Sequence, residues 1–137
     1  MLQVKTRSDT SRGVRFMATI CLYQDTRHEH PLLWMRDVFD IGYVSRRSDG
    51  ITELRINGFA SVRRVLTLLQ PYVRFKTAQV TALLQACRIL ETSSVGQLSE
   101  AQLRAVVDLV FIIKEHNYKS RQTLTKDTLL LRLGLTP

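Results

Sequence analysis

The sequence of 137 residues has little cysteine, little proline and no long hydrophobic run. Two cysteines, Cys21 and Cys87, are too few for a disulfide framework or a zinc site. No apolar stretch approaches the roughly 20 residues that span a bilayer, and residues 1–20 lack the hydrophobic segment of a signal peptide. No linker, repeat or low-complexity segment divides the chain. These absences indicate an intracellular protein with reduced thiols, a single domain over residues 1–137 and no membrane partner.

The charge is strongly positive. Twenty lysines and arginines oppose 12 aspartates and glutamates, which gives a net charge of +8. The basic residues are scattered through the chain instead of being confined to a tail, a pattern that favours a polyanionic partner such as nucleic acid. Many soluble or ribosome-bound proteins are also basic, so charge alone leaves this point open.

Alternating polar and apolar residues predict strands. The segments 3–7 and 14–23 alternate, and a hairpin follows Gly42 and turns at Ser48-Asp49-Gly50. Phe16, Ala18, Ile20 and Leu22 form the inner face of the longest strand. On the simplest pairing, the opposite face carries side chains that can donate, accept or contact methyl groups: Gln3, Lys5, Arg7, Arg15, Met17, Thr19, Cys21, Tyr23, Ser45, Arg47, Glu53 and Arg55. An ordinary solvated sheet face would also alternate in this way.

Helical spacing predicts the remaining elements. A helix is expected from about Thr26 to Asp40, with Pro31 tolerated in its first turn. The residues expected to pack inward are Leu32, Leu33, Met35, Val38, Phe39 and, in part, Trp34. The next helix has Val62, Val65, Leu66 and Leu69 on one stripe and is stopped by Pro71. Further helices cover 77–91, the stretch from the cap Ser99 to about Asn117, and the stretch from the cap Thr125 to Leu133. The order predicts an α+β fold, an antiparallel four-stranded sheet with helices on one face.

Two histidines precede Pro31. His28 and His30 lie near Asp25 and Glu29, which raises the possibility of a metal site. Their spacing matches no zinc pattern, and solvated residues at a helix start explain them better. The sequence therefore predicts no metal ligands.

Three stretches carry a family resemblance. Gly42-Tyr43-Val44, the segment from Leu69 to Gln79 (LQPYVRFKTAQ) and the segment from His116 to Thr125 (HNYKSRQTLT) occur in the order found in the single-domain LAGLIDADG homing endonucleases. The chain resembles this family from about Gln3 to Leu135. The resemblance implies a saddle-shaped sheet whose concave face contacts bases and phosphates in the DNA major groove.

The chain departs from the family at its defining motif. That motif is a helix ending in an acidic residue, and the carboxylates of two such helices hold divalent metals. By the resemblance, Met1 falls at the start of the first strand, so this helix would lie before residue 1. We therefore expect no cofactor for the chain as given, and Mg²⁺ only where an acidic helix is supplied. Without this helix, Ile20, Leu22 and Leu54 are expected to be poorly covered, which predicts a protein or RNA partner.

The rest of the family's catalytic pocket is partly kept. By the resemblance, Gln24 occupies the position of a water-ordering residue, Lys76 that of a basic residue near the scissile phosphate, and His28 a position that is often arginine. The resemblance thus implies these three as remaining catalytic positions. For Lys76, an ordinary lysine at a helix start is the alternative.

Three functions fit these observations. The first is a homing endonuclease whose motif helix comes from another chain or from upstream sequence. The second is a nucleic-acid-binding relic that no longer cleaves. The third is a component of a ribonucleoprotein such as an organellar ribosome. Loss of the acidic helix favours the last two.

The polyanion is predicted to be RNA slightly ahead of DNA. The family normally pairs two such sheets on one DNA site. A single sheet can still bind through contacts to the phosphate backbone of a nucleic acid, and RNA can be recognised by its shape and backbone alone. A second basic patch in the tail, Lys119, Ser120 and Arg121, is expected to help. The family favours a mitochondrial or plastid origin, with a bacterial or phage origin as the alternative.

Overall fold

The sheet has the predicted architecture. The computed structural model describes residues 1–10, 12–117 and 124–137. Over these residues the chain forms a four-stranded antiparallel sheet in the order β1-β2-β4-β3. The strands are β1 (Leu2–Thr6), β2 (Val14–Asp25), β3 (Tyr43–Arg46) and β4 (Ile51–Asn57). The α+β class and the order of elements are confirmed.

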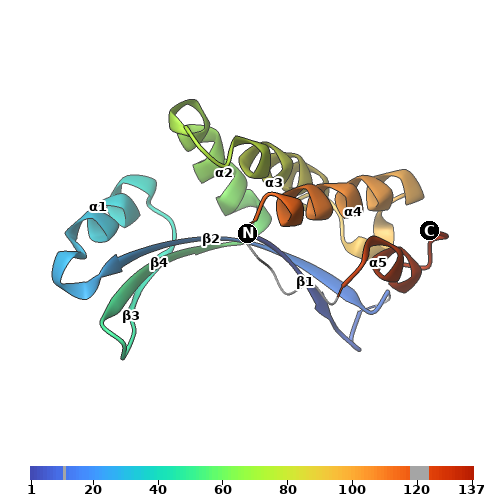
Figure 1. The fold of residues 1–137 in the computed structure, drawn as a ribbon, viewed down its shortest axis with the longest axis horizontal. Coiled ribbons are helices and arrows are strands. Elements are labelled where there is room, and N and C mark those ends of the chain that lie inside the picture. Colours follow the sequence, from blue (N-terminus) through green and yellow to red (C-terminus); the bar gives the residue numbers. More distant parts are fainter. Residues whose placement is uncertain (11, 118–123) are drawn as a thin grey trace.

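The helices lie on one side of the sheet. They are α1 (His30–Phe39), α2 (Phe59–Leu69), α3 (Thr77–Leu90), α4 (Glu100–Glu115) and α5 (Lys126–Arg132), with 3-10 turns at Thr26–His28, Gln70–Tyr72 and Val95–Gln97. Figure 1 shows the sheet arched, with the helices above its convex side. The concave side faces away from all the helices that the structure describes.

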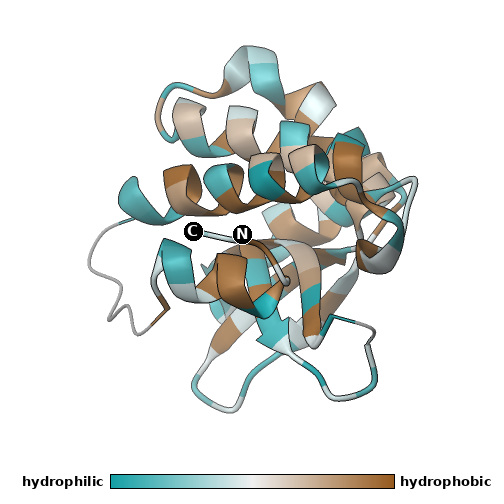
Figure 2. Ribbon diagram, turned by 90° about the vertical axis from the view of Figure 1, so that its right-hand side faces the viewer, coloured by the Kyte–Doolittle hydropathy of each residue, from teal (hydrophilic) through white to brown (hydrophobic). Residues whose placement is uncertain are grey.

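Alternation in β2 fixes which residues face the helices. Val14, Phe16 and Ala18 are buried, and the pairing of Leu22 with Leu54 and of Ile20 with Ile56 brings the apolar faces of β2 and β4 together. Because side chains alternate along a strand, the odd-numbered residues of β2 point to the concave side. Seen from the end where α5 lies, hydrophobic parts gather between helices and sheet, and the turns below are hydrophilic (Figure 2).

The helix ends follow local chemistry. Pro71 lies in the 3-10 turn directly after α2, as expected of a residue that cannot continue a helix. The Ser99 side chain accepts from the Gln102 backbone N–H, and the Gln102 side chain accepts from the Ser99 N–H, which makes a capping box for α4. Thr125 caps α5 through the N–H of Thr128. The predicted helices are thus confirmed, with ends that differ by a few residues.

Helix α1 packs differently from the prediction. Leu32 and Phe39 are buried, but Trp34 is 65% exposed and Val38 57% exposed. This short helix contacts β3 and β4 at one end of the sheet, and no described element covers its other flank. The inward packing expected of Trp34 and Val38 is therefore wrong.

The expected gap over the sheet is also wrong at two positions. Leu54 is 0% exposed and Ile20 9% exposed, because α1 packs on β4 and α2 packs on β2. Leu22 is partly buried against the core. Within the described residues, no helix is both long and apolar enough to cross a membrane.

Candidate nucleic-acid interface

Strand register gathers the predicted polar residues on the concave face. Gln3 pairs with Met17 and Lys5 with Arg15 across β1 and β2. Cys21 pairs with Arg55, and Tyr23 pairs with Glu53, which in turn pairs with Ser45. Directly paired residues of an antiparallel sheet project to the same side. The shared face is confirmed, while the binding role of its residues stays a prediction.

Two arginines lie at the turns beside this face. Arg7 follows β1 and pairs with Asp9 at 2.6 Å, and Arg47 follows β3 and pairs with Asp49 at 2.6 Å. The hydrogen bonds from Arg7 lower the pKa of Asp9 to about 2. Both pairs are largely exposed, and exposed pairs contribute little stability. Each arginine can therefore exchange its carboxylate for a phosphate at small cost.

Two predicted contact residues are buried within the face. Thr19 is 5% exposed and donates to Asn57 Oδ1 at 3.0 Å. Glu53 is also 5% exposed and accepts a hydrogen bond from Arg55, which raises the pKa of that arginine. Neighbouring strands flank both residues, so their side chains are covered. The expectation that they are open to a ligand is corrected: in this structure Glu53 positions Arg55.

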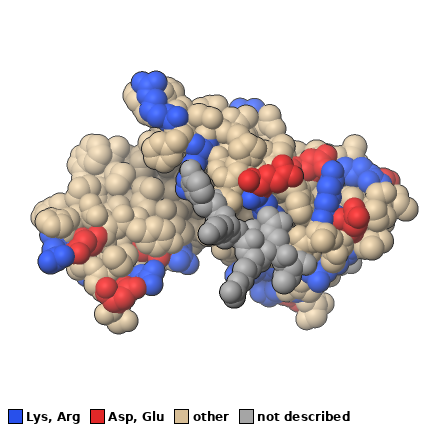
Figure 3. Space-filling view, in the orientation of Figure 1, with Lys and Arg blue, Asp and Glu red and all other residues tan. Residues whose placement is uncertain are grey.

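The positive charge on the concave face that has no described acidic partner is concentrated at the end formed by β1 and the start of β2. Within the described residues, no carboxylate lies within 4.0 Å of Lys5 or Arg15, whereas Arg7, Arg47 and Arg55 each have one. Lys5 and Arg15 are both exposed. Basic side chains, several of them beside acidic ones, line the lower edge of the molecule (Figure 3). Lys5 and Arg15 are thus the cations on this face that are most available to a polyanion.

The three catalytic positions implied by the resemblance make no described hydrogen bond or ion pair with one another. Gln24 is exposed at the end of β2, and its Oε1 accepts from the Asp25 N–H at 3.1 Å. His28 is exposed in the 3-10 turn before α1, and Lys76 precedes α3 in a left-handed conformation with φ 61°. No hydrogen bond or ion pair within the described ranges links Gln24, His28 and Lys76. Their catalytic role remains a prediction.

The described side chains do not fit a metal site. Among them, no group of three or more His, Cys, Asp or Glu residues could hold a metal ion. The carboxylates nearest the histidines are already engaged: Asp25 binds Arg27 at 2.8 Å, and Glu29 binds Arg46 at 2.5 Å. The hydrogen bonds from Arg46 and Thr52 lower the pKa of Glu29. The described residues therefore support no catalytic step through Mg²⁺.

One residue of the concave face escaped the sequence prediction. Tyr43 pairs with Arg55 and is 51% exposed. Its alternation with Ser45 in β3 was the available signal. The predicted tail patch, Lys119, Ser120 and Arg121, lies outside the described residues.

A saddle with helices on one side and a polar concave face defines a class of protein. No model of a protein family matches the sequence. The DNA endonuclease I-CvuI from Chlorella vulgaris is 30% identical over 104 residues, which span 75% of this chain and 65% of that protein. The chain thus covers less than two-thirds of the length of this relative.

Solved structures share the fold. I-CvuI in complex with the I-CreI target superposes with a TM-score of 0.82 at 22% identity, covering 99% of this chain and 86% of the other. The archaeal intron-encoded homing endonuclease I-Vdi141I, complexed with DNA, gives 0.82 at 16% identity over 97% of this chain and 84% of the other. The LAGLIDADG meganuclease I-AabMI, bound to uncleaved DNA, gives 0.67 at 21% identity over 86% and 42%.

The similarities in fold and in sequence agree with each other. The chain has the fold of solved homing endonucleases, among them a LAGLIDADG meganuclease, and over 104 residues its sequence is similar to that of the DNA endonuclease I-CvuI.

Proposed function

We propose that this chain binds duplex DNA on the concave face of its sheet. The observation that carries the proposal is the register of Lys5 with Arg15: it places two exposed cations side by side on a face that no described helix covers. Lysine and arginine neutralise backbone phosphates, which supply most of the affinity for DNA. Met17, Tyr23, Ser45 and Arg55 on the same face can contact base edges in the major groove.

DNA is the better-supported polyanion. The sequence placed RNA slightly ahead, but the proteins of the same fold, I-CvuI and I-Vdi141I, were solved with DNA. The arch of the sheet also gives a concave surface to a duplex (Figure 1). The ribosomal and RNA-binding hypotheses rest on the absent acidic helix, the basic charge and the predicted tail patch, and none of the similar proteins named above supports them. An organellar origin stays a proposal, compatible with a relative from Chlorella vulgaris.

A partner that covers exposed apolar side chains is part of the proposal. Trp34 and Val38 on α1 are more than half exposed, as are Leu68, Tyr72 and Phe75 at and beyond the end of α2. Helix α1 and the end of α2 lie on the same, convex side of the sheet (Figure 1). The surface over α1 is largely uncharged (Figure 3). Such surfaces mark interaction sites. A second protein chain packed here would extend the DNA-binding face.

The second candidate function is DNA cleavage, favoured by an endonuclease relative. We expect the purified 137-residue chain to bind duplex DNA but not to cut it with Mg²⁺ or Mn²⁺, because its described carboxylates form no metal site. Binding is measured by fluorescence anisotropy with duplex DNA and duplex RNA of one sequence, and cleavage on supercoiled plasmid. Tighter binding to RNA than to DNA would overturn the choice of DNA. Cleavage at a defined site, abolished by EDTA, would establish the endonuclease instead.

A further inference from the structure

Two arginines share a cavity outside the concave face. A cavity of about 530 Å³ is lined by Arg12, Gly96, Arg132, Leu133 and Gly134. It lies where the β1–β2 hairpin meets the end of α5. A neighbouring cavity of about 590 Å³ also reaches Gly96 and extends along β2 past Arg15. The two cavities therefore adjoin at this end of the sheet.

Both arginines are held by hydrogen bonds that leave most of their donors unused. Arg12 Nη1 donates to the carbonyl oxygen of Leu133 at 2.6 Å, and Arg132 Nη1 donates to Thr6 Oγ1 at 3.1 Å. A guanidinium carries five N–H donors in a planar fork that matches the oxygens of a phosphate. Each arginine is thus fixed in place with donors to spare.

Neither arginine is neutralised. Within the described ranges, no carboxylate lies within 4.0 Å of Arg12 or Arg132, although eight other arginines and Lys126 have such a partner. Two like charges that line one cavity repel each other, more strongly where the groups are partly buried, as Arg12 is. An anion in the cavity would relieve this repulsion.

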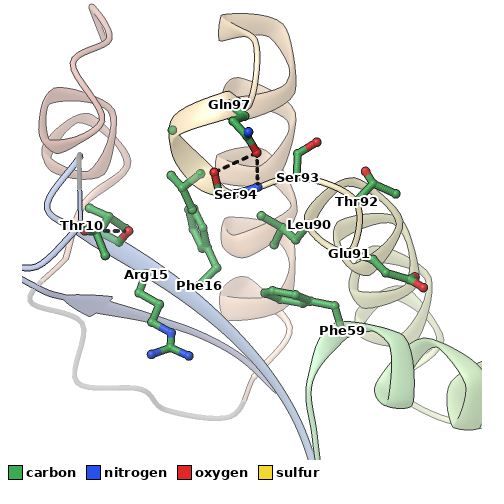
Figure 4. Close-up of a pocket in the computed structure, with 13 residues that line it drawn as sticks. Thr10, Arg15, Phe16, Phe59, Leu90, Glu91, Thr92, Ser93, Ser94 and Gln97 are labelled. Atoms are coloured by element: carbon green, nitrogen blue, oxygen red, sulfur yellow. Dashed lines mark hydrogen bonds between the residues drawn. The ribbon is translucent and has the colours of Figure 1, made fainter.

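The position favours the DNA backbone as that anion. Arg132 contacts Thr6, which follows Lys5 in β1, and Arg12 lies in the turn that leads to Arg15 in β2. Figure 4 shows the Arg15 side chain leaving β2 on the side opposite to Phe16, Phe59 and Leu90. The four cations therefore run from the concave face around the end of the hairpin to α5.

We propose that Arg12 and Arg132 form a phosphate-binding site that takes the DNA backbone beyond the concave face. The site rests on the proposed function and enlarges it, because it lengthens the stretch of duplex that one chain holds. Contacts to phosphate position a protein without reading sequence. The site adds affinity and salt dependence and leaves base preference unchanged.

The test compares charge-removing variants. The double variant Arg12→Gln/Arg132→Gln removes both charges, and its control, Arg64→Gln/Arg88→Gln, removes two cations on α2 and α3 that also lack an acidic partner among the described residues. Affinity for a duplex of about 30 base pairs, roughly three helical turns, is measured by anisotropy over a range of salt. We expect the slope of log K against log salt to fall by about two units in the double variant, at about 0.9 per phosphate contact, and to stay constant in the control. Arg12→Lys/Arg132→Lys should restore most of the slope.

The outcomes separate this site from the concave face. If the double variant keeps the wild-type slope while Lys5→Ala/Arg15→Ala reduces affinity, the site is overturned and the proposed function stands. If only the Arg12 and Arg132 variant reduces affinity, these two arginines hold the DNA, and both the concave face and the role of the site as its extension are overturned. Equal slopes in all variants, or no DNA binding by the wild-type chain, would overturn both. The single variant Arg132→Gln, at an exposed position, gives the same test at half the effect if the double variant unfolds.

Discussion

Replacing Gly42 with alanine should lower the free energy of unfolding by about 3 kcal/mol. Gly42 has φ 99° and precedes β3, and a Cβ there would lie 2.8 Å from the Arg55 carbonyl oxygen and 2.9 Å from Ile56 Cγ1. An L-residue in this backbone region costs about 1–2 kcal/mol, and an added atom in a packed site costs about 1–3 kcal/mol. Because one of the atoms is backbone, β3 must shift away from β4. Urea unfolding followed by circular dichroism measures the change.

Gly58→Ala is the matched control for this steric effect. Gly58 has φ 94°, but no atom outside its chain neighbours lies within 4 Å of the position of its Cβ. This variant should therefore show only the backbone part of the destabilisation, about 1–2 kcal/mol. Equal destabilisation at Gly42 and Gly58 would show that β3 does not pack against β4 as closely as described.

The second large effect is expected on DNA binding. Lys5→Ala/Arg15→Ala should weaken binding about tenfold for each charge-assisted hydrogen bond to phosphate that the substitution removes, and it should lower the salt slope by about two units. Lys5 and Arg15 lie opposite each other in the register of β1 and β2, and neither has an acidic partner among the described residues. Arg47→Ala/Arg55→Ala should have a smaller effect, because Asp49 and Glu53 already neutralise part of the charge of those arginines.

Arg64→Ala/Arg88→Ala controls for the change in net charge. Both positions lie on helices on the far side of the sheet. If this control weakens binding as much as Lys5→Ala/Arg15→Ala, the affinity reflects total charge and not the concave face.

The fold could be predicted because each element carries a local signal. The alternation over residues 14–23 in β2, the turn at Asp49-Gly50 and the capping box at Ser99 each specify one structure. The family resemblance then added the curvature of the sheet, which alternation cannot supply.

Burial within the polar face was harder to predict. Alternation assigns Thr19 and Glu53 to a side of the sheet, but their exposure depends on the strands that flank them. Glu53 and Arg55 are two residues apart on one strand, and this spacing was a usable signal for their ion pair. Arg47 and Asp49 are also two residues apart and form an ion pair, but they lie in a turn. Residues two apart on a strand share a face, and opposite charges there attract each other.

The exposure of α1 could not be found from its own sequence. Its apolar residues are more numerous than one face can bury, so Trp34 and Val38 fit an inward or an outward position equally well. Only the position of α1 at the end of the sheet decides between the two. The same holds for Arg12 and Arg132, which lie 120 residues apart in sequence and meet in one cavity.

Alkylation of Cys21 tests the concave face most directly. Cys21 is partly exposed and pairs with Arg55 on that face, whereas Cys87 is 0% exposed in the core and burial raises the pKa of its thiol to about 11. Iodoacetamide is uncharged, so the charge of DNA does not repel it. In the free chain it should modify Cys21 and spare Cys87, because the thiolate is the reactive form and must be accessible. With saturating duplex DNA, mass spectrometry should show Cys21 protected; modification of Cys21 at the same rate with and without bound DNA would contradict binding on the concave face.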